Sequence, residues 1–234
     1  MNDTQLSPTL VKEAKSLFDM GAHLGHKKNR LHPKARKYVY KIMNGVSIID
    51  LSMTVTMLDK AKKQLKELAK EEKVLLVVAT KKIISQFTAE TCEKNKVAYI
   101  TSKWLPGLLT NFDTIIKNVK SMNDLRTEKE SGAWDKYVKH ERISLDKKLS
   151  KLEKFYKGLT NITKKPDALL IVDIKKEKNA VKEGTTHQLP LICVVDTNSN
   201  PELVDTPIIV NDDSPSVMQH VITDLVEAYA SGRG

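Results

Sequence analysis

The chain has 234 residues, of which 40% are hydrophobic and 29% charged, and it carries a net charge of +10. These totals allow one large domain or one domain with an insertion. They favour a nucleic acid or another anionic surface as partner. No run approaches the ~18 apolar residues of a membrane span, and residues 1–5 lack signal-peptide features, so no membrane partner is expected. The two cysteines, Cys92 and Cys193, are expected to be small buried hydrophobic residues of a reducing compartment.

A helix is predicted to begin at Ser7-Pro8, where a hydroxyl can cap the first turn and proline suits the first helical position. Gly21 is expected to stop it. A loop follows over residues 21–37, named here the basic segment. From Met20 to Ile49 there is no Asp or Glu; the stretch holds His23, His26, Lys27, Lys28, Arg30, His32, Lys34, Arg36, Lys37 and Lys41. A block of one charge sign stays solvated unless a polyanion lies against it, and nucleic-acid phosphates are the commonest such partner.

The next stretches indicate a hairpin and then an α/β sheet. Asn44-Gly45 lies between residues 38–42 and 46–49, which is a strong β-hairpin signal. Asp50 or Ser52 can cap the next helix, which is predicted to run to Lys70. Fully apolar runs typical of buried parallel strands alternate with helical stretches, so a doubly wound, mainly parallel sheet is expected. The strands are predicted at 74–79, 97–100, 167–172, 190–195 and 208–210, and the helices at 82–95, 175–186 and 214–230.

Residues 111–158 interrupt this alternation with a long, polar, helix-prone segment. Its two apolar stripes flank Gly132, which predicts an antiparallel helical hairpin inserted in the sheet domain. From Lys117 to Lys157 it has twelve Lys/Arg and seven Asp/Glu; ion pairs along the helices account for many of them. The predicted division is one α/β sheet domain over residues 1–110 and 159–230, the hairpin over 111–158, and a short tail over 231–234.

Several polar groups follow predicted strands. Thr80-Lys81-Lys82 follows the first strand; it is either an anion site at the strand end or an ordinary polar loop. Residues 196–198 and 211–213 hold carboxylates that favour turn and capping chemistry. A remaining possibility is a divalent cation, Mg or Zn, held by His26, Asp196 and Asp212; no other cofactor is expected. His23 and His26 are expected to form hydrogen bonds or contact phosphates rather than to act in catalysis. Trp104 is expected to be a buried core residue.

Strings of residues along the whole chain resemble one family, the bacterial small-subunit ribosomal protein S-two. The matching strings occur in family order: residues 21–26, Asn29-Arg30, Pro33-Lys34, 44–51, 80–82, 104–105 with Gly107, 109–112, 166–169, 172–173, 195–198 and 211–213. Pro106 departs from the glycine that the family usually has before Gly107. The resemblance implies a flavodoxin-like fold with a coiled-coil insertion. It also implies a place on the solvent side of the small subunit of a bacterial-type, cytoplasmic ribosome, between head and body and against small-subunit rRNA.

We therefore expect a structural constituent of the small ribosomal subunit that supports translation without catalysis. Its partners would be rRNA and neighbouring ribosomal proteins, including ribosomal protein S-one, and no small-molecule substrate. The hairpin is expected to add a second contact, to rRNA or to a protein. The predicted RNA-binding residues are His23, His26, Lys27, Lys28, Asn29, Arg30, His32, Lys34, Arg36, Lys37, Lys81, Lys82, Lys103 and Asn111.

Two alternatives stay open. One is an α/β enzyme or phosphate-binding protein that uses Lys81 and Lys82 for phosphate and Asp196 or Asp212 as base. The sequence has no Gly-x-Gly-x-x-Gly or Walker-type string, which disfavours it. The other is an RNA-binding regulator that works off the ribosome.

Overall fold

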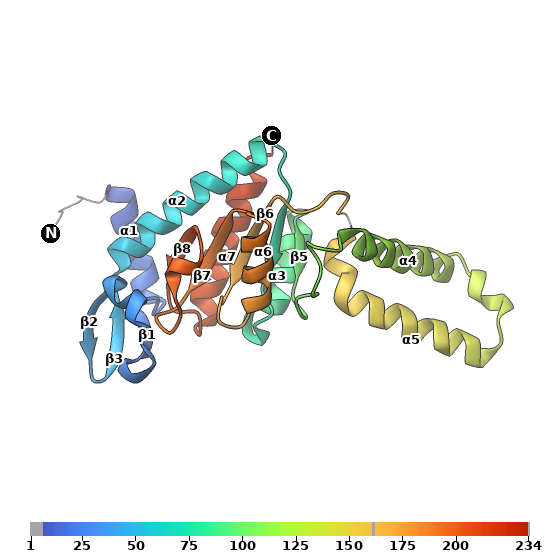
Figure 1. Cartoon of the computed structure of the whole chain (residues 1–234), viewed down its shortest axis with the longest axis horizontal. Coiled ribbons are helices and arrows are strands. Elements are labelled where there is room, and N and C mark those ends of the chain that lie inside the picture. The colour runs from blue at the N-terminus through green and yellow to red at the C-terminus, as the bar shows by residue number, and fades with distance from the viewer. Residues whose placement is uncertain (1–6, 161, 234) are drawn as a thin grey trace.

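The computed structural model describes residues 7–160 and 162–233. Residues 1–6 and 234, which the predicted domains and tail include, lie outside the described residues. Figure 1 shows an α/β body from which two long helices extend on one side, while a small sheet lies at the opposite end.

The centre of the body is a five-stranded sheet in which every neighbouring pair of strands is parallel. Its spatial order is β5-β4-β6-β7-β8. Counted along the chain this is the order 2-1-3-4-5, which defines the flavodoxin-like doubly wound fold and confirms the expected fold class. The strands are β4 (Leu75–Val78), β5 (Ala98–Ile100), β6 (Ala168–Val172), β7 (Leu191–Val195) and β8 (Thr206–Ile209).

Alternate residues of these strands enter two separate cores, because side chains along a strand point to opposite faces. Leu75 and Val77 pack on one face, and Leu76 and Val78 on the other. Helices α1, α2, α3 and α7 cover the first face, and α6 with the base of the hairpin covers the second (Figure 1). Their bounds are α1 (Pro8–Asp19), α2 (Leu51–Lys70), α3 (Lys82–Lys94), α6 (Lys178–Thr186) and α7 (Pro215–Ala230).

Local signals set several helix ends. The Ser7 hydroxyl accepts from the Leu10 amide at the start of α1, and the Asp50 carboxylate accepts from the Ser52 amide at the start of α2. Gly21 follows α1 with a φ of +82°, a conformation that glycine adopts at little cost. Helix α6 begins three residues later than predicted, after a turn in which Asp173 has a φ of +64°.

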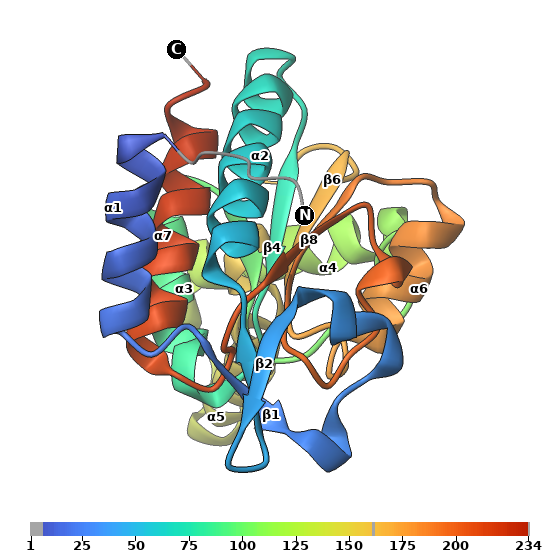
Figure 2. The same cartoon turned by 90° about the vertical axis from the view of Figure 1, so that its left-hand side faces the viewer.

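The second sheet has three antiparallel strands in the order β1-β3-β2. Figure 2 labels its outer strands, β1 and β2. The predicted hairpin is confirmed: Asn44 and Gly45 have φ values of +49° and +77°, as a two-residue hairpin turn requires. The expectation of a continuous loop over residues 21–37 was wrong at its start, because Leu24 pairs with Ile48 and makes a third strand. The strands are β1 (Leu24–Lys27), β2 (Val39–Met43) and β3 (Val46–Ile49).

The inserted segment forms two helices, α4 (Phe112–Glu130) and α5 (Lys139–Tyr156), which run side by side away from the body and back (Figure 1). Gly132, with a φ of +73°, begins the turn between them. The distal half has a small core of its own, made by Met122, Leu125, Trp134 and Leu149. Supercoiling of the pair, and domain boundaries at residues 110 and 158, stay predictions.

Candidate nucleic-acid interface

The first half of the basic segment presents its charges to solvent. Lys27 ends β1, and Lys28, Asn29 and Arg30 form a single 3-10 turn; all four side chains are exposed. The Lys28 amide donates to the Gly45 carbonyl at 2.8 Å, which ties this turn to the tip of the hairpin. Among the described residues no carboxylate lies within 4.0 Å of the charged groups of Lys27, Lys28 or Arg30. Three exposed cations therefore form no ion pair within 4.0 Å, although the charge of Arg30 contributes to the lowered pKa of Asp213.

The second half is differently arranged. Residues 33–38 form a 3-10 helix that His32 caps, its Nδ1 accepting from the Lys34 amide at 3.2 Å. The ammonium groups of Lys34 and Lys37 lie 2.8 Å and 3.3 Å from the carboxylate of Glu202. Arg36 is exposed, with no carboxylate partner among the described residues. Exposed ion pairs like these contribute little stability, so a phosphate can compete for both lysines.

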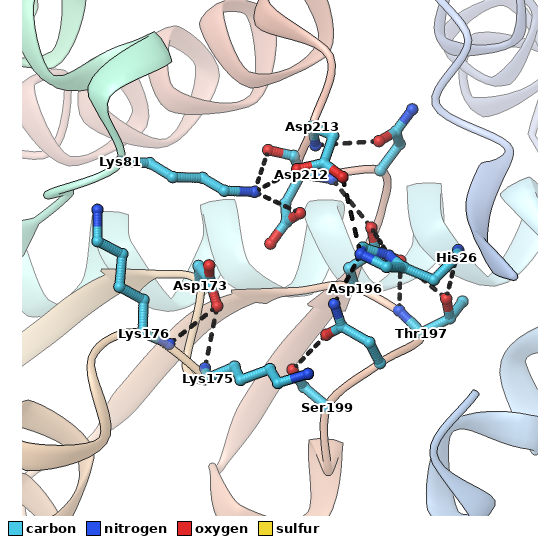
Figure 3. Close-up of polar contacts among 12 residues, drawn as sticks. His26, Lys81, Asp173, Lys175, Lys176, Asp196, Thr197, Ser199, Asp212 and Asp213 are labelled. Atoms are coloured by element: carbon cyan, nitrogen blue, oxygen red, sulfur yellow. Dashed lines mark hydrogen bonds and ion pairs between the residues drawn. The ribbon is translucent and has the colours of Figure 1, made fainter. Parts of the chain in front are cut away.

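His26 points inward, toward the carboxyl ends of the parallel strands (Figure 3). Its Nδ1 lies 3.0 Å from Asp196 Oδ2. Its Nε2 lies 2.8 Å from the side-chain amide nitrogen, Nδ2, of Asn198 and 3.7 Å from Asp213 Oδ2. The hydrogen bond with Asp196 raises the pKa of His26 against the opposing effect of burial. The imidazole thus joins β1 to the main sheet, and its side chain is only 14% exposed.

Gly25 permits this close approach. A Cβ at this position would lie 2.7 Å from the Thr197 side chain, so a larger residue would push β1 away from the loop after β7. The His26 amide donates to Thr197 Oγ1 at 2.9 Å, and the His32 amide donates to the Thr197 carbonyl at 2.9 Å. The basic segment is therefore fixed at both ends of its first half.

The next cation along the sheet edge is Lys81, which follows β4 (Figure 3). Its ammonium lies 2.7 Å from Asp212 Oδ1 and 2.8 Å from Asp213 Oδ1. Burial raises the pKa of Asp212 to about 6 even though Lys81 opposes the shift. Asp213 is hydrogen-bonded by Lys81, which lowers its pKa. The structure therefore places Lys81 inside a network of its own chain.

The predicted cation set is not assembled as expected. Asp212 is turned to Lys81, and Asp213 is the second carboxylate within ligand distance of His26 and Asp196. Two adjacent aspartates cannot be told apart from the sequence, since only the direction of the chain after β8 decides which one faces the imidazole.

The other predicted residues are spread over the surface. His23 stacks on Phe18 with ring centroids 4.2 Å apart, so its ring is engaged within the chain. Lys82 and Lys103 are exposed at the ends of β4 and β5. Asn111 is exposed at the start of α4, where its side chain accepts from the Thr114 hydroxyl at 2.8 Å. Among the described residues, no hydrogen bond or ion pair joins Lys82, Lys103 or Asn111 to the basic segment.

One residue that holds a predicted string in place, Glu183, was not predicted. The Glu183 carboxylate accepts from Trp104 Nε1 at 3.1 Å, from the Gly107 amide at 2.8 Å and from the Leu109 amide at 3.2 Å. Trp104 itself is a core anchor as expected, being 4% exposed. Nothing in the sequence around Glu183 marks it, because its partners lie more than 70 residues away.

A hollow of about 500 Å³ lies between the basic segment and the sheet edge. Lys27, Asn29 and Arg30 line it together with His26, Asp196 and Asp213. The hollow therefore mixes both signs of charge: Asp196 is buried, whereas the Asp213 side chain is 64% exposed beside the cations. Exposed Lys and Arg side chains are the groups that contact phosphate oxygens in backbone recognition.

Fold and site together define a class of protein: a flavodoxin-like α/β domain with an exposed basic surface at one end. The family model described as "Ribosomal protein S2" matches residues 17–232. The chain is 37% identical to the small ribosomal subunit protein uS2 of Oenococcus oeni, covering 94% of this chain and 84% of that one. It is 39% identical to the protein of the same name of Dictyoglomus turgidum, over 94% and 89%, and 36% identical to that of Gloeobacter violaceus, over 93% and 79%. The chain belongs to the ribosomal protein S2 family.

This membership confirms the expected function. The protein is a structural constituent of the small subunit of the cytoplasmic ribosome and not an enzyme. Its partners are rRNA and other ribosomal proteins. No helix within the described part of the chain is long and apolar enough to cross a membrane.

Proposed function

We propose that the basic segment binds the phosphate backbone of small-subunit rRNA. The observation that carries this proposal is the set of three exposed cations, Lys27, Lys28 and Arg30, at the end of β1 and in the turn that follows it, none of which forms an ion pair within 4.0 Å among the described residues. Arg36 extends the surface, and Asn29, His32, Lys34 and Lys37 line it. His23 and His26 support it from behind, through the contact with Phe18 and the bond with Asp196. Lys82, Lys103 and Asn111 supply separate contacts, while Lys81 orders the acidic loop beside them.

Charge neutralisation makes the proposal measurable. Each cation that neutralises a phosphate releases condensed counterions, so binding weakens linearly with the logarithm of salt concentration. The triple variant K27Q/K28Q/R30Q should lower the magnitude of the salt slope for small-subunit rRNA by about 2 to 3. Filter binding over a range of salt concentrations measures the slope.

The matched control is K60Q/K66Q/K70Q, which removes the same charge from three exposed lysines of α2. This control should keep the parental slope. Equal slopes for the parent chain and K27Q/K28Q/R30Q would contradict the proposal.

We further propose that a divalent cation binds between His26, Asp196 and Asp213, whose ligand atoms lie within 4.8 Å of one another. One imidazole with two carboxylates suits Zn²⁺ better than Mg²⁺, which prefers all-oxygen ligands. Added Zn²⁺ should raise the thermal midpoint of the parent chain and leave that of D196N unchanged. An equal response of both proteins would refute a site at Asp196.

Ribosomal protein S-one enters as a proposed neighbour. The outer face of the small sheet exposes Leu24, Tyr40 and Met43, which are 45%, 70% and 47% exposed. An apolar hollow of about 590 Å³ lies over them. Exposed apolar patches of this kind mark protein contacts, so L24S/M43S should weaken co-sedimentation of the S-one protein with assembled subunits. Unchanged co-sedimentation would refute this docking place.

A further inference from the structure

The two helices of the hairpin divide their charges unequally. The acidic side chains of α5 face α4 or the helix start: Asp146 pairs with Lys129 at 2.7 Å, Glu153 with Arg126 at 2.8 Å, and Glu141 accepts from the Val138 amide. No other Asp or Glu occurs in α5. The negative charge of this helix is therefore used within the hairpin.

Four lysines of α5 form a lysine stripe: Lys147, Lys148, Lys151 and Lys154. The other two cations of the helix, Lys139 and Arg142, lie near its start, where Arg142 is 3.6 Å from Asp135. At 3.6 residues per turn these four positions fall within about a third of the helix circumference. They lie opposite Leu145, Leu149 and Leu152, which face α4. All four are exposed, and no carboxylate of the described residues lies within 4.0 Å of their ammonium groups.

The outer face of α4 offers an internal comparison. It also exposes lysines, Lys117 and Lys120, but Asp113, Asp124 and Glu128 share the same face. That face is close to neutral. Composition alone therefore does not explain the stripe, since the same hairpin mixes the signs on α4 and separates them on α5.

We propose that the lysine stripe of α5 binds the phosphate backbone of double-helical RNA. The inference rests on the proposed function in one respect, that the polyanion is rRNA, but it concerns a different surface at the opposite end of the molecule (Figure 1). Figure 1 also shows α5 flanked by α4 on one side only, so the stripe is open to a large partner.

The side-chain chemistry favours RNA over an acidic protein. Protein interfaces are depleted of lysine and centre on buried aromatic or apolar anchors. Here the half-buried Phe155 lies under Lys154, and Ile143, at the distal end, is 45% exposed. Double-helical RNA is recognised mainly through its shape and its phosphate and ribose groups, for which lysine ammonium groups suffice. No base-edge specificity is expected.

The experiment uses tethered hydroxyl-radical cleavage in reconstituted complexes of the full chain with small-subunit rRNA. Both native cysteines are buried, so a cysteine introduced at Ser144, beside the stripe, carries the iron chelate selectively. A matched probe at the exposed Thr127 of α4 reports the opposite helix. Probe S144C should cut double-helical rRNA strongly and T127C weakly. Absent cutting from S144C, or cutting equal to that from T127C, would overturn the proposal.

Charge removal supplies the second measurement. K147Q/K151Q should lower the magnitude of the salt slope of rRNA binding by about 1.5, whereas K117Q/K120Q, which removes the same charge from α4, should leave it unchanged. Glutamine keeps helix propensity close to that of lysine, and circular dichroism confirms the helix. An unchanged salt slope for K147Q/K151Q overturns the proposal. This holds even if the variant enters subunits less well, because that result would indicate a lost contact with a protein.

The outcome is separable from that of the basic segment. If K27Q/K28Q/R30Q loses salt slope and K147Q/K151Q does not, the stripe proposal fails and the basic segment stands. If only K147Q/K151Q loses slope, the stripe stands and the proposed function of the basic segment fails.

Discussion

At the residue scale, a buried carboxylate occupies the point where the strand order reverses. Glu177 is 4% exposed and accepts from the Thr80 hydroxyl, while Lys176 donates to the Thr80 carbonyl at 2.6 Å. Related sheets bind nucleotides in the crevice outside the strand ends at this switch point. Here side chains from the loops after β4 and β6 bond to one another across it, which agrees with a structural rather than a catalytic protein.

Burial raises the pKa of Glu177 above its ordinary value, against the opposing effects of Thr80 and Lys176. Between the unfolded and the folded pKa the native state binds more protons, so the contribution of Glu177 to stability falls as pH rises through this window. The variant E177Q should therefore gain stability relative to the parent chain as pH rises above 4.5, reaching a constant difference above the folded pKa. Urea denaturation across this pH range measures the difference.

The control is E130Q, which makes the same change at an exposed glutamate at the end of α4. A difference between E177Q and the parent chain that is constant with pH, like that expected for E130Q, would contradict the assigned burial effect.

At the element scale, one side chain joins the loop after β5 to α6. Glu183 accepts from three N–H groups of residues 104–109. Among the described residues, no other side chain accepts hydrogen bonds from all three of these groups. The loop leads into α4, so this carboxylate also fixes where the hairpin leaves the body. A single charged acceptor thus supports a junction between two elements.

Removing this acceptor should be costly. E183A leaves part-buried donors unpaired and should lower the free energy of unfolding by about 2 to 4 kcal/mol. E183Q keeps one acceptor oxygen in place and should recover part of the loss. Chemical denaturation followed by tryptophan fluorescence measures both, and equal stability of E183A and the parent chain would exclude this role.

At the scale of the whole molecule, two positive surfaces lie at opposite ends of an α/β body. The sheet face between them is covered by helices, and from Asp196 to Ala230 the chain has seven acids and no Lys or Arg. Under the two proposals above, charges of one sign at both ends and acids along the C-terminal part orient the protein on a polyanion. The molecule is suited to bridge separate parts of a folded RNA.

The apolar side chains of the hairpin belong to two cores, one shared with the sheet and one made within the hairpin itself. Ile115 and Val119 belong to the core of the sheet, whereas Met122, Leu125, Trp134 and Leu149 form a distal core. Replacing residues 122–149 by a short Gly-Ser linker should therefore change the unfolding free energy of the body by less than about 1 kcal/mol. Replacing residues 112–157 also removes Ile115 and Val119 and should cost several kcal/mol, roughly 2 to 5 for each large buried side chain.

Urea denaturation of both deletion variants tests this difference, with fluorescence of Trp104 as the probe of the body. Equal stability loss in the two variants would show that the hairpin has one core rather than two. That result would also argue against residues 111–158 as a separable unit.

The sequence by itself determined the elements and their class. Apolar runs at 74–79, 167–172 and 190–195 are typical of strands buried on both faces, and Asn44-Gly45 is a strong hairpin signal. Both signals act over a few neighbouring residues. The charge block of the basic segment and the family strings were likewise visible without coordinates.

Only the tertiary structure decided which side chains meet. Four features depend on residues far apart in the chain. They are the third strand β1, the position of Asp213 rather than Asp212 beside His26, the Glu183 junction, and the separation of charges between α4 and α5. Such contacts follow from chain direction after a turn and from packing geometry. The sequence pattern does not determine either of them. A shift of one residue in strand register, or a small change in the angle of a turn, brings a different side chain into contact.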